Sequence, residues 1–412
     1  MKTVGIIAEY NPFHNGHAYH IAKAKEVTGA DYCIVVLGGD FTQRGLPAMM
    51  GKSLRAHAAL LGGADLVIEL PIAYSTGSAE YFAHGAVSLL DKLCVVDTLC
   101  FGSECGNLDT LMRLADALLA ETPAYKEHLK RQLKFGQSYP LARYLALKAT
   151  APQLEDVLPA LQEPNNILGI EYLKALRRRK SKIVPITIPR IGAHYNSSDI
   201  LPGYSSASAL RRAITIEQAF PALEDQFPDN VYALMKAHLY QCFPIEPEDI
   251  CCLLPYKVML EKDADFTKYF DINQDFSNRL RKALSNYNGF TSLCGKISSG
   301  NETQTGIARK LAHILLDIYQ TDIDHYCKDD YIYYARILGF RKASTPLLKK
   351  IKAKSHIPLL SKLADANSLI PDTNGQKMLL QDINASKLYD LLIYQRFHQE
   401  TVNEYQKEIM IL

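Results

Sequence analysis

The sequence predicts an α/β protein, in which a Rossmann-like doubly wound parallel sheet is followed by a mainly α-helical domain. Short apolar runs alternate with helical patterns over the first 100 residues, a further strand pattern returns at Lys182–Ile188, and residues 215–412 carry almost no strand signal. Strands that alternate with helices of about 10–15 residues form right-handed βαβ units and a parallel sheet. Pro185 in the returning run indicates an edge strand or a bulge.

The expected strands of the first 100 residues are four apolar runs. Three of them end at a glycine or a proline, and helical patterns fill the intervals between them. The strands are Thr3–Ala8, Tyr32–Leu37, Asp65–Leu70 and Cys94–Phe101, and the helices are Gly16–Val27, Lys52–Leu61 and Ser78–Leu90. Ligands of open α/β sheets bind outside the carboxyl ends of the strands, so we expect the functional site at that edge.

We divide the chain into two domains. Residues 1–214 contain the sheet, with a helical insertion at about 106–180. Residues 215–412 form the helical domain, which includes patterns such as Gly306–Tyr319 and Lys387–Phe397.

The composition is that of a globular protein with a large core. The 412 residues are 48% hydrophobic, and 46 Lys and Arg against 44 Asp and Glu give a net charge of +2. This balance excludes a disordered chain, a collagen and a wholly basic coat protein, but not a local basic patch. The nine Cys form no C-x-x-C pair, which indicates free thiols, no zinc site and a reducing cytoplasm. The apolar run Val4–Ala8 is too short for a signal peptide or a membrane span.

The most specific motif is H-x-G-H, formed by His14, Gly16 and His17 directly after the first strand. A nucleotide phosphate at this place meets the free N–H groups and the positive dipole end of the first helix. Gly16 lets the backbone approach closely, and two imidazoles can stabilise charge that develops on an α-phosphate. The alternative is a pair of histidines with ordinary hydrogen bonds at a helix start.

A second phosphate-binding element is expected where Ser206, Ser208 and Arg211 begin a helix after Pro202-Gly203. Its N-terminus and the guanidinium suit the departing β- and γ-phosphates. Capping of the helix by Ser206 or Ser208 is the alternative.

Together the two elements resemble the nucleotidyltransferase superfamily. A closer resemblance is to the bacterial tRNA(Met) cytidine acetate ligase family, and it is carried by VGIIAEYNPFHNGH, GGDFTQRGLPA, GADLVIELP, FGSE, NNILGIEYLKAL and YARILGF. The resemblance covers the whole chain. Ser208 stands where the second motif of the family is expected to have Thr, and it keeps the hydroxyl.

The resemblance implies that ATP activates acetate as acetyl-adenylate, with release of pyrophosphate. The acetyl group then passes to N4 of the wobble cytidine of elongator tRNA(Met). It also implies His14, His17 and Arg211 as catalytic residues. The implied ATP-binding residues are Ile7, Ala8, Glu9, Tyr10, Asn11, Pro12, Phe13, Asn15, Gly16, His20, Gly102, one of Asn165 and Asn166, Arg190, Ser206 and Ser208. Mg²⁺ is a candidate counter-ion of ATP that the sequence does not reveal.

Asp40, Gln43 and Arg44 follow the second strand at the expected binding edge. Asp40 is predicted to orient a reacting group or to hold the cytidine amine, and Arg44 to pair with the acetate carboxylate. The alternative for Asp40 is a hydrogen bond that stabilises the loop. Lys52 and Arg55 follow a near P-loop pattern that we reject for its spacing and its proline; they face either phosphates or solvent.

Other residues near the strand ends have two interpretations each. Glu9 is as suited to a structural role as to a metal or a sugar hydroxyl, and Glu104 is expected to be structural. Asn165 and Asn166 precede a helix and are caps as readily as ligands of ATP. Arg190 lies at a strand end, where a guanidinium can face a phosphate.

Two basic runs suggest a surface that follows RNA phosphates. The first is Arg177–Lys180. The second has no acidic residue and contains Arg336, Arg341, Lys342, Lys349, Lys350, Lys352, Lys354 and Lys362. A solvated helix face is the alternative for both.

Two other functions remain open at this point. One is a small-molecule adenylyltransferase of the same superfamily, and the other is a non-catalytic RNA-binding protein. The basic C-terminal half argues against the first, and the intact motifs argue against the second. We expect a cytoplasmic enzyme without a membrane association or an obligate protein partner.

Overall fold

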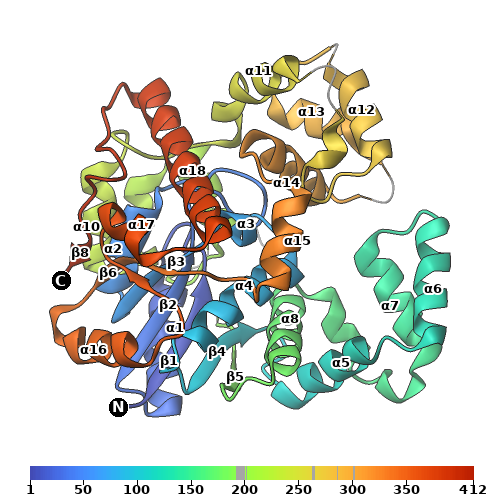
Figure 1. Ribbon diagram of the computed structural model, residues 1–412, viewed down its shortest axis with the longest axis horizontal. Helices are drawn as coiled ribbons and strands as arrows, with labels where there is room; N and C mark the ends of the chain where they lie inside the picture. The colour runs from blue at the N-terminus through green and yellow to red at the C-terminus, as the bar shows by residue number, and fades with distance from the viewer. Residues whose placement is uncertain (192–199, 201, 262–264, 285, 300–301) are drawn as a thin grey trace.

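The computed structural model describes residues 1–191, 200, 202–261, 265–284, 286–299 and 302–412. Helices pack on both faces of a central sheet, as Figure 1 shows. Within the described residues the sheet has eight strands in the order β5-β4-β1-β2-β3-β6-β7, and β8 pairs with β6. The prediction of an α/β protein with a mostly parallel sheet is confirmed.

The first five strands are parallel and lie close to the predicted positions. They are β1 (Thr3–Ala8), β2 (Tyr32–Gly38), β3 (Leu66–Leu70), β4 (Thr98–Ser103) and β5 (Val184–Pro189). β1 pairs with β2 and β4, and β5 pairs with β4 at the edge of the sheet. The edge position of β5 is confirmed and explains how the strand tolerates Pro185.

Four helices follow these strands. They are α1 (Asn15–Thr28), α2 (Lys52–Leu61), the short α3 (Ile72–Ser75) and α4 (Ala79–Lys92). α1 ends because Gly29 adopts a left-handed conformation with φ of 61°, which Gly accepts without strain. The buried side chains of α1 and α2 pack on one face of the sheet, and those of α4 pack on the other.

The predicted insertion is helical. It contains α5 (Leu108–Ala120), α6 (Pro123–Lys134), α7 (Tyr139–Thr150) and α8 (Pro164–Arg179). α8 packs on α4 and α5, whereas α6 and α7 pair with each other away from the sheet (Figure 1).

The second half is mainly helical. Its helices are α9 (Ala207–Thr215), α10 (Asp229–His238), α11 (Leu253–Leu260), α12 (Gln274–Leu284), α13 (Phe290–Ile297), α14 (Gln304–Leu315), α15 (Gln320–Lys328), α16 (Thr345–Lys354), α17 (Ala366–Leu369) and α18 (Thr373–Phe397). Short 3-10 helices lie at Pro152–Leu154, Leu158–Gln162, Phe220–Gln226, Pro247–Ile250, Phe266–Lys268, Lys342–Ser344 and Leu363–Asp365.

The mainly helical second half also contains short strands that the sequence did not reveal. β6 (Ala335–Phe340) runs antiparallel to β3, and β7 (Leu359–Leu360) and β8 (Met410–Ile411) pair with β6. The charge of Arg336 interrupts the short apolar run of β6, which hides the strand in the sequence. The division at residue 214 stays a prediction, but the sheet runs across it.

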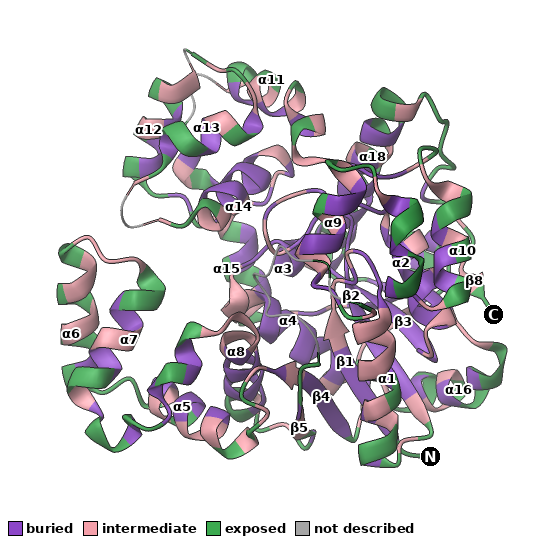
Figure 2. Cartoon of the chain, turned by 180° about the vertical axis from the view of Figure 1, so that it is seen from behind, coloured by how far each residue is buried: buried purple, intermediate pink, exposed green. Residues whose placement is uncertain are grey.

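The central strands are buried on both faces, as Figure 2 shows, which explains their continuous apolar sequences. None of the described helices combines the length and the apolar character that crossing a bilayer requires.

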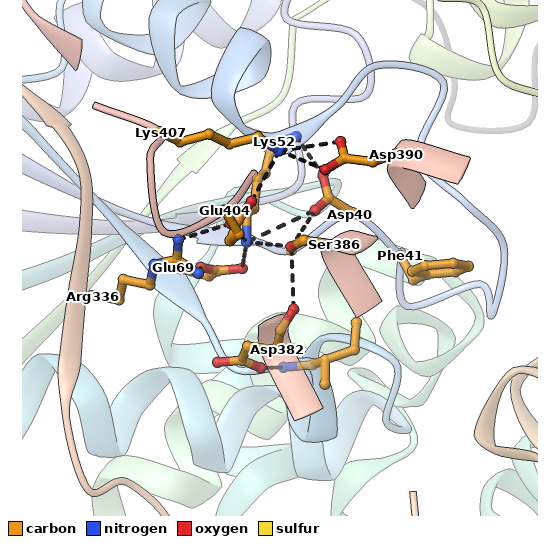
Figure 3. A network of polar contacts seen from close by, with 12 residues as sticks. Asp40, Phe41, Lys52, Glu69, Arg336, Asp382, Ser386, Asp390, Glu404 and Lys407 are labelled. Carbon is orange, nitrogen blue, oxygen red and sulfur yellow. Dashed lines mark hydrogen bonds and ion pairs between the residues drawn. The ribbon is translucent and has the colours of Figure 1, made fainter. Parts of the chain in front are cut away.

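A buried ion cluster joins the sheet to the C-terminal segment (Figure 3). Lys52 Nζ lies 2.7 Å from Glu69 Oε1 and 2.8 Å from Glu404 Oε1, and it donates to Ser386 Oγ at 2.7 Å. Arg336 binds the same two carboxylates at 3.1 and 2.7 Å. Burial alone raises the pKa of Glu404, but Lys52 and Arg336 hold this pKa well below its ordinary value.

We predict that Lys52→Met lowers the free energy of unfolding by about 3–5 kcal/mol, because it leaves buried carboxylates without their ammonium partner. Urea denaturation measures the change. Lys236→Met is the control, since Lys236 is exposed on α10. Equal stabilities of the two variants would contradict the prediction.

Candidate functional site

A cavity of about 530 Å³ lies at the carboxyl ends of the parallel strands, where it was predicted. Its wall is built from the end of β1, the start of α1, the loop after β2, the ends of β4 and β5, and the starts of α8 and α9. Of the predicted catalytic and ATP-binding residues, those that line it are Ile7, Ala8, Glu9, Tyr10, Asn11, His14, Gly16, His17, His20, Gly102, Asn165, Arg190, Ser206, Ser208 and Arg211.

The rings of His14 and His17 lie against each other at the start of α1, with an angle of 34° between their planes. Their ring centroids are 3.8 Å apart. His14 is the N-cap residue: its Nδ1 accepts the Gly16 N–H at 3.1 Å, and the His14 N–H donates to His17 Nδ1 at 3.3 Å. Both Nδ1 atoms are therefore acceptors, which assigns the proton of each neutral ring to Nε2. The alternative interpretation, a pair of histidines with ordinary hydrogen bonds at a helix start, therefore describes these contacts correctly. The same bonds also leave an Nε2–H donor on each ring at the cavity.

These imidazoles are neutral in the folded protein. Burial, with the positive charges of Arg190 and Arg211, lowers the pKa of His14 to about 3. Burial and Arg190 lower the pKa of His20 to about 4, and burial and His14 lower the pKa of His17 well below its ordinary value. The site therefore presents imidazoles as uncharged hydrogen-bond donors.

α9 supplies the second predicted element. Ser206 is its N-cap and accepts the Ala209 N–H at 3.1 Å, and the Ser206 and Ser208 hydroxyls lie 2.9 Å apart. Arg211 Nη1 donates to the carbonyl of Asn11 at 2.7 Å. This bond brings the start of α9 to the loop between β1 and α1, so the two predicted motifs face the same cavity.

The ends of β4 and β5 form a third side. A Cβ at Gly102 would lie 3.3 Å from Arg190 Cγ, so this glycine permits the close approach of the two strand ends. Arg190 Nη1 donates to Asn165 Oδ1 at 3.4 Å, and Asn165 Nδ2 donates to Glu104 Oε1 at 2.5 Å. The predicted structural role of Glu104 is confirmed, because it also accepts the backbone N–H groups that begin α8.

The structure distinguishes Asn166 from Asn165, of which one was expected to contact ATP. Asn166 is buried, and its Oδ1 accepts the N–H groups of Glu104 and Cys105 at 3.0 and 3.2 Å. It lies outside the cavity wall, whereas Asn165 lines it. Of the two residues, Asn165 is therefore the one placed to contact a nucleotide.

Three residues of the first loop also lie outside the cavity wall. Phe13 is fully buried, and a Cβ at Gly62 would lie 2.1 Å from its ring. Asn15 Nδ2 donates to the carbonyls of Gly203 and Asp225, and Pro12 follows a cis peptide bond after Asn11. These residues shape the loop, and their contacts with ATP stay predictions.

The prediction for Asp40 is wrong, because it does not line the cavity. Its Oδ1 accepts the Lys52 N–H at 2.7 Å, and its Oδ2 accepts the Ser386 hydroxyl at 2.8 Å (Figure 3). The carboxylate is only 5% exposed. Asp40 fixes the start of α2 against α18, as the alternative of a loop-stabilising residue proposed.

Lys52 and Arg55 face neither phosphates nor solvent. Arg55 is fully buried and donates to the carbonyls of Glu9 and Gly38 at 2.6 and 3.0 Å, and to that of Gly39. It therefore satisfies carbonyl groups at the ends of β1 and β2.

Several residues of the wall were missed by the sequence. They include Thr42, Leu46 and Met49 of the loop after β2, Phe82, Phe101 and Tyr172, and Ile245–Pro247 from the second half. Gln43, which was expected at the binding edge, also lines the cavity. Arg44 lines the cavity, and its pairing with acetate stays a prediction. The loop after β2 belongs to the motif GGDFTQRGLPA. The approach of Ile245–Pro247 to the cavity depends on tertiary packing and has no signal in the local sequence.

The first basic run has a structural role. Arg178 pairs with Glu80 at 2.6 Å, Arg177 pairs with Asp116, and Arg179 pairs with Asp91. The three arginines attach α8 to its neighbours.

The second basic run is divided by the structure. Arg336 is buried in the ion cluster and cannot reach RNA, and the Arg341 guanidinium donates to the carbonyl of Leu60. Lys350 donates to the carbonyl of Met1 at 3.2 Å. Lys362, which follows β7, is exposed. From β6 to the end of α16, the exposed lysines are Lys342, Lys349, Lys352 and Lys354.

These exposed lysines lie at the far edge of the sheet. Phe340, at the end of β6, pairs with Leu66 at the start of β3, and α16 follows β6 directly. The cavity opens at the opposite ends of the parallel strands. Any contact of α16 with RNA is therefore remote from the cavity.

Three residues that line the cavity each have a buried polar atom without a hydrogen-bond partner among the described residues. Tyr10 Oη, His20 Nε2 and Gln43 Nε2 are buried, and none has a hydrogen-bond partner among the described residues. Buried polar groups are nearly always paired, but such atoms also occur away from the cavity, at Thr3, Ser277 and Tyr287, so they do not by themselves indicate a bound molecule. The described part of the chain contains no cluster of three or more His, Cys, Asp or Glu that could hold a metal ion.

A parallel α/β sheet with paired imidazoles at its first strand–helix junction defines a protein of the nucleotidyl-transfer class. The profile of the HIGH Nucleotidyl Transferase family matches residues 1–405. The chain is 37% identical to the tRNA(Met) cytidine acetate ligase of Acetivibrio thermocellus over 100% of both chains, and 40% identical to the protein of that name from Caldanaerobacter subterraneus subsp. tengcongensis over 95% of each. The protein belongs to the tRNA(Met) cytidine acetate ligase family.

A solved structure supports the same relationship. The Thermotoga maritima protein TmcAL bound with alpha-thio ATP superimposes with a TM-score of 0.92 at 28% sequence identity, over 100% of both chains. The apo form of that protein gives a TM-score of 0.94. The resemblance on which the family was predicted is confirmed.

We predict that stability falls as the pH drops from about 6.5 toward 4. The unfolded chain binds more protons in this window, because the folded pKa of His14 is about 3 and the ordinary value is 6.5. At pH 5, His14 alone should lower the free energy of unfolding by ~2 kcal/mol relative to pH 7. Urea denaturation at the two pH values should show this difference reduced in His14→Asn. The exposed control His398→Asn should retain it, and an equal reduction in both variants would contradict a buried neutral His14.

Proposed function

We propose that this protein is an ATP-dependent ligase that activates acetate as acetyl-adenylate and acetylates N4 of the wobble cytidine of elongator tRNA(Met) in the cytoplasm. The observation that carries the proposal is the pair of Nε2–H donors at the cavity, in a chain that is 37–40% identical over nearly its full length to curated tRNA(Met) cytidine acetate ligases. An ATP analogue on the Thermotoga maritima relative supports ATP as the nucleotide.

In the first step, an acetate oxygen attacks the α-phosphorus of ATP and pyrophosphate leaves with the electron pair of the broken P–O bond. In this proposal, His14, His17 and the start of α1 stabilise the α-phosphate as charge develops. Arg211 and the hydroxyls of Ser206 and Ser208 hold the departing phosphates. Gly102, Asn165 and Arg190 form the remaining side for the nucleoside.

The neutral state of the imidazoles is compatible with these roles. A donor that is already uncharged and fixed by its own Nδ1 bond does not need to reorganise when charge builds on the phosphate. Arg190 and Arg211 supply the positive charge that a triphosphate requires.

The second step explains why acetate must be activated first. The lone pair of the cytosine amine is delocalised into the ring, so this amine is a weak nucleophile. A mixed anhydride of acetate and AMP offers a carbonyl carbon with a good leaving group. A cytidine of an anticodon loop can reach such a cavity only when it is unstacked.

We predict that His14→Ala lowers acetate-dependent exchange of pyrophosphate into ATP about 100- to 1000-fold, because one donor to the α-phosphate is lost. Binding of tRNA should stay within about threefold, since the RNA is not held by this side chain. Exchange kinetics and filter binding measure the two effects. Loss of tRNA binding with intact exchange would contradict the assignment.

The chemical identity of the product tests the proposal directly. The protein is incubated with ATP, acetate and bulk tRNA, and the digested nucleosides are analysed by mass. A cytidine that is heavier by one acetyl group supports the ligase. ATP turnover that is indifferent to both acetate and tRNA would contradict it.

We also propose that the exposed lysines of α16 contact the tRNA backbone. Reversal of charge at Lys349, Lys352 and Lys354 should weaken tRNA binding for all sequences and reduce its salt slope by about one per lost phosphate contact. Binding titrations at several salt concentrations measure the slope. An unchanged slope would remove α16 from the RNA-binding surface.

A further inference from the structure

Two carboxylates from the described residues line the cavity, and they differ in how they are held. Glu246 lies at the rim, where its carboxylate is bound by Arg396 and caps the 3-10 helix Pro247–Ile250. Glu9 lies at the end of β1, next to the loop that carries His14.

Glu9 is fixed in both its backbone and its side chain. Its carbonyl accepts from Arg55 Nη1 at 2.6 Å, and its Oε1 accepts the Gln43 N–H at 2.6 Å. The hydroxyl of Tyr172 lies close enough for the charge of Glu9 to add to burial in raising the pKa of Tyr172. A carboxylate has about four lone-pair sites, so this bond leaves acceptor capacity for a substrate.

Gln43 places a donor beside this acceptor. Its backbone N–H holds Glu9, and its side-chain Nε2 is buried with no hydrogen-bond partner among the described residues. Both residues line the cavity, and neither belongs to a basic or an acidic cluster. The pair therefore offers one acceptor and one unpartnered donor at neighbouring positions.

We propose, on the basis of the proposed function, that Glu9 and Gln43 recognise the Watson–Crick edge of the target cytosine, a role for the Glu9 side chain that replaces its predicted contact with ATP. The exocyclic N4 amine donates to the Glu9 carboxylate, and ring N3 accepts from Gln43 Nε2. Carboxylates are suitable acceptors for the cytosine N4 amine, and unstacked RNA bases are read on this edge.

The same contact gives Glu9 a role in the transfer step. The N4 nitrogen forms a bond to the acetyl carbonyl carbon, while the bond from this carbon to the phosphate oxygen breaks and AMP leaves with its electron pair. The N4 proton passes to the Glu9 carboxylate. A positioned base of this kind contributes about 100- to 10,000-fold.

The pair also discriminates against uracil. Uracil presents O4, an acceptor, where cytosine presents N4–H, and it presents N3–H where cytosine presents an acceptor. Both contacts would then face groups of the same kind, and a site built on such bonds rejects the mismatched partner strongly.

Glu9→Gln is the central test, because glutamine keeps the shape and can still accept the Gln43 N–H. Acetate-dependent pyrophosphate exchange, measured without tRNA, reports the first step. Single-turnover transfer to tRNA from acetyl-adenylate formed on the enzyme reports the second. We expect transfer to fall at least 100-fold more than exchange in Glu9→Gln, and about 10-fold more in Gln43→Leu.

Glu246→Gln is the matched comparison. A loss of transfer in Glu246→Gln as large as that in Glu9→Gln would overturn the assignment, and so would equal losses of exchange and transfer in Glu9→Gln. Retention of transfer in Glu9→Gln would overturn it as well. Absence of acetate-dependent exchange in the wild-type protein would instead contradict the proposed function itself.

Discussion

The buried ammonium of Lys52 is the constraint on which the shape of the cavity depends. It lies between carboxylates of β3 and of the C-terminal segment, and its backbone N–H is held by Asp40. The loop between Asp40 and Lys52 forms one wall of the cavity. Such a cluster costs desolvation energy, which only a full set of partners offsets. The wall is therefore in place only when the C-terminal segment is packed.

The cavity combines positive charge with neutral donors. Arg190 and Arg211 approach the imidazoles closely enough to lower the pKa of His14. The guanidinium groups that attract a triphosphate thus also keep the imidazoles uncharged. Each ring retains its Nε2–H because its Nδ1 is already bonded. Burial, the two guanidinium charges and the Nδ1 hydrogen bonds together keep the imidazoles neutral and their donors fixed.

The sequence predicts best what is local. The bounds of α2 were predicted to the residue, and H-x-G-H was placed at the first strand–helix junction because its signal lies within 15 residues. Asp40 and Arg336 were misassigned for the opposite reason. Their partners, Ser386 and Glu404, are 346 and 68 residues away, and a charge without a visible partner looks functional in a sequence. The role of Asn166 was ambiguous in the sequence, because its side-chain oxygen accepts hydrogen bonds from the backbone of the turn at Glu104.

The second half of the chain takes part in enclosing the cavity. Ile245–Pro247 line it, and β6 extends the sheet beside β3. At the tip of the loop after β2, a Cβ on Gly45 would lie 2.3 Å from the backbone nitrogen of Arg309 in α14. The loop that carries Gln43 is therefore pressed against a helix of the second half. Because this contact is between backbones, a displacement of α14 must displace the loop, so the helices that follow residue 215 set the geometry at which a base meets Glu9 and Gln43.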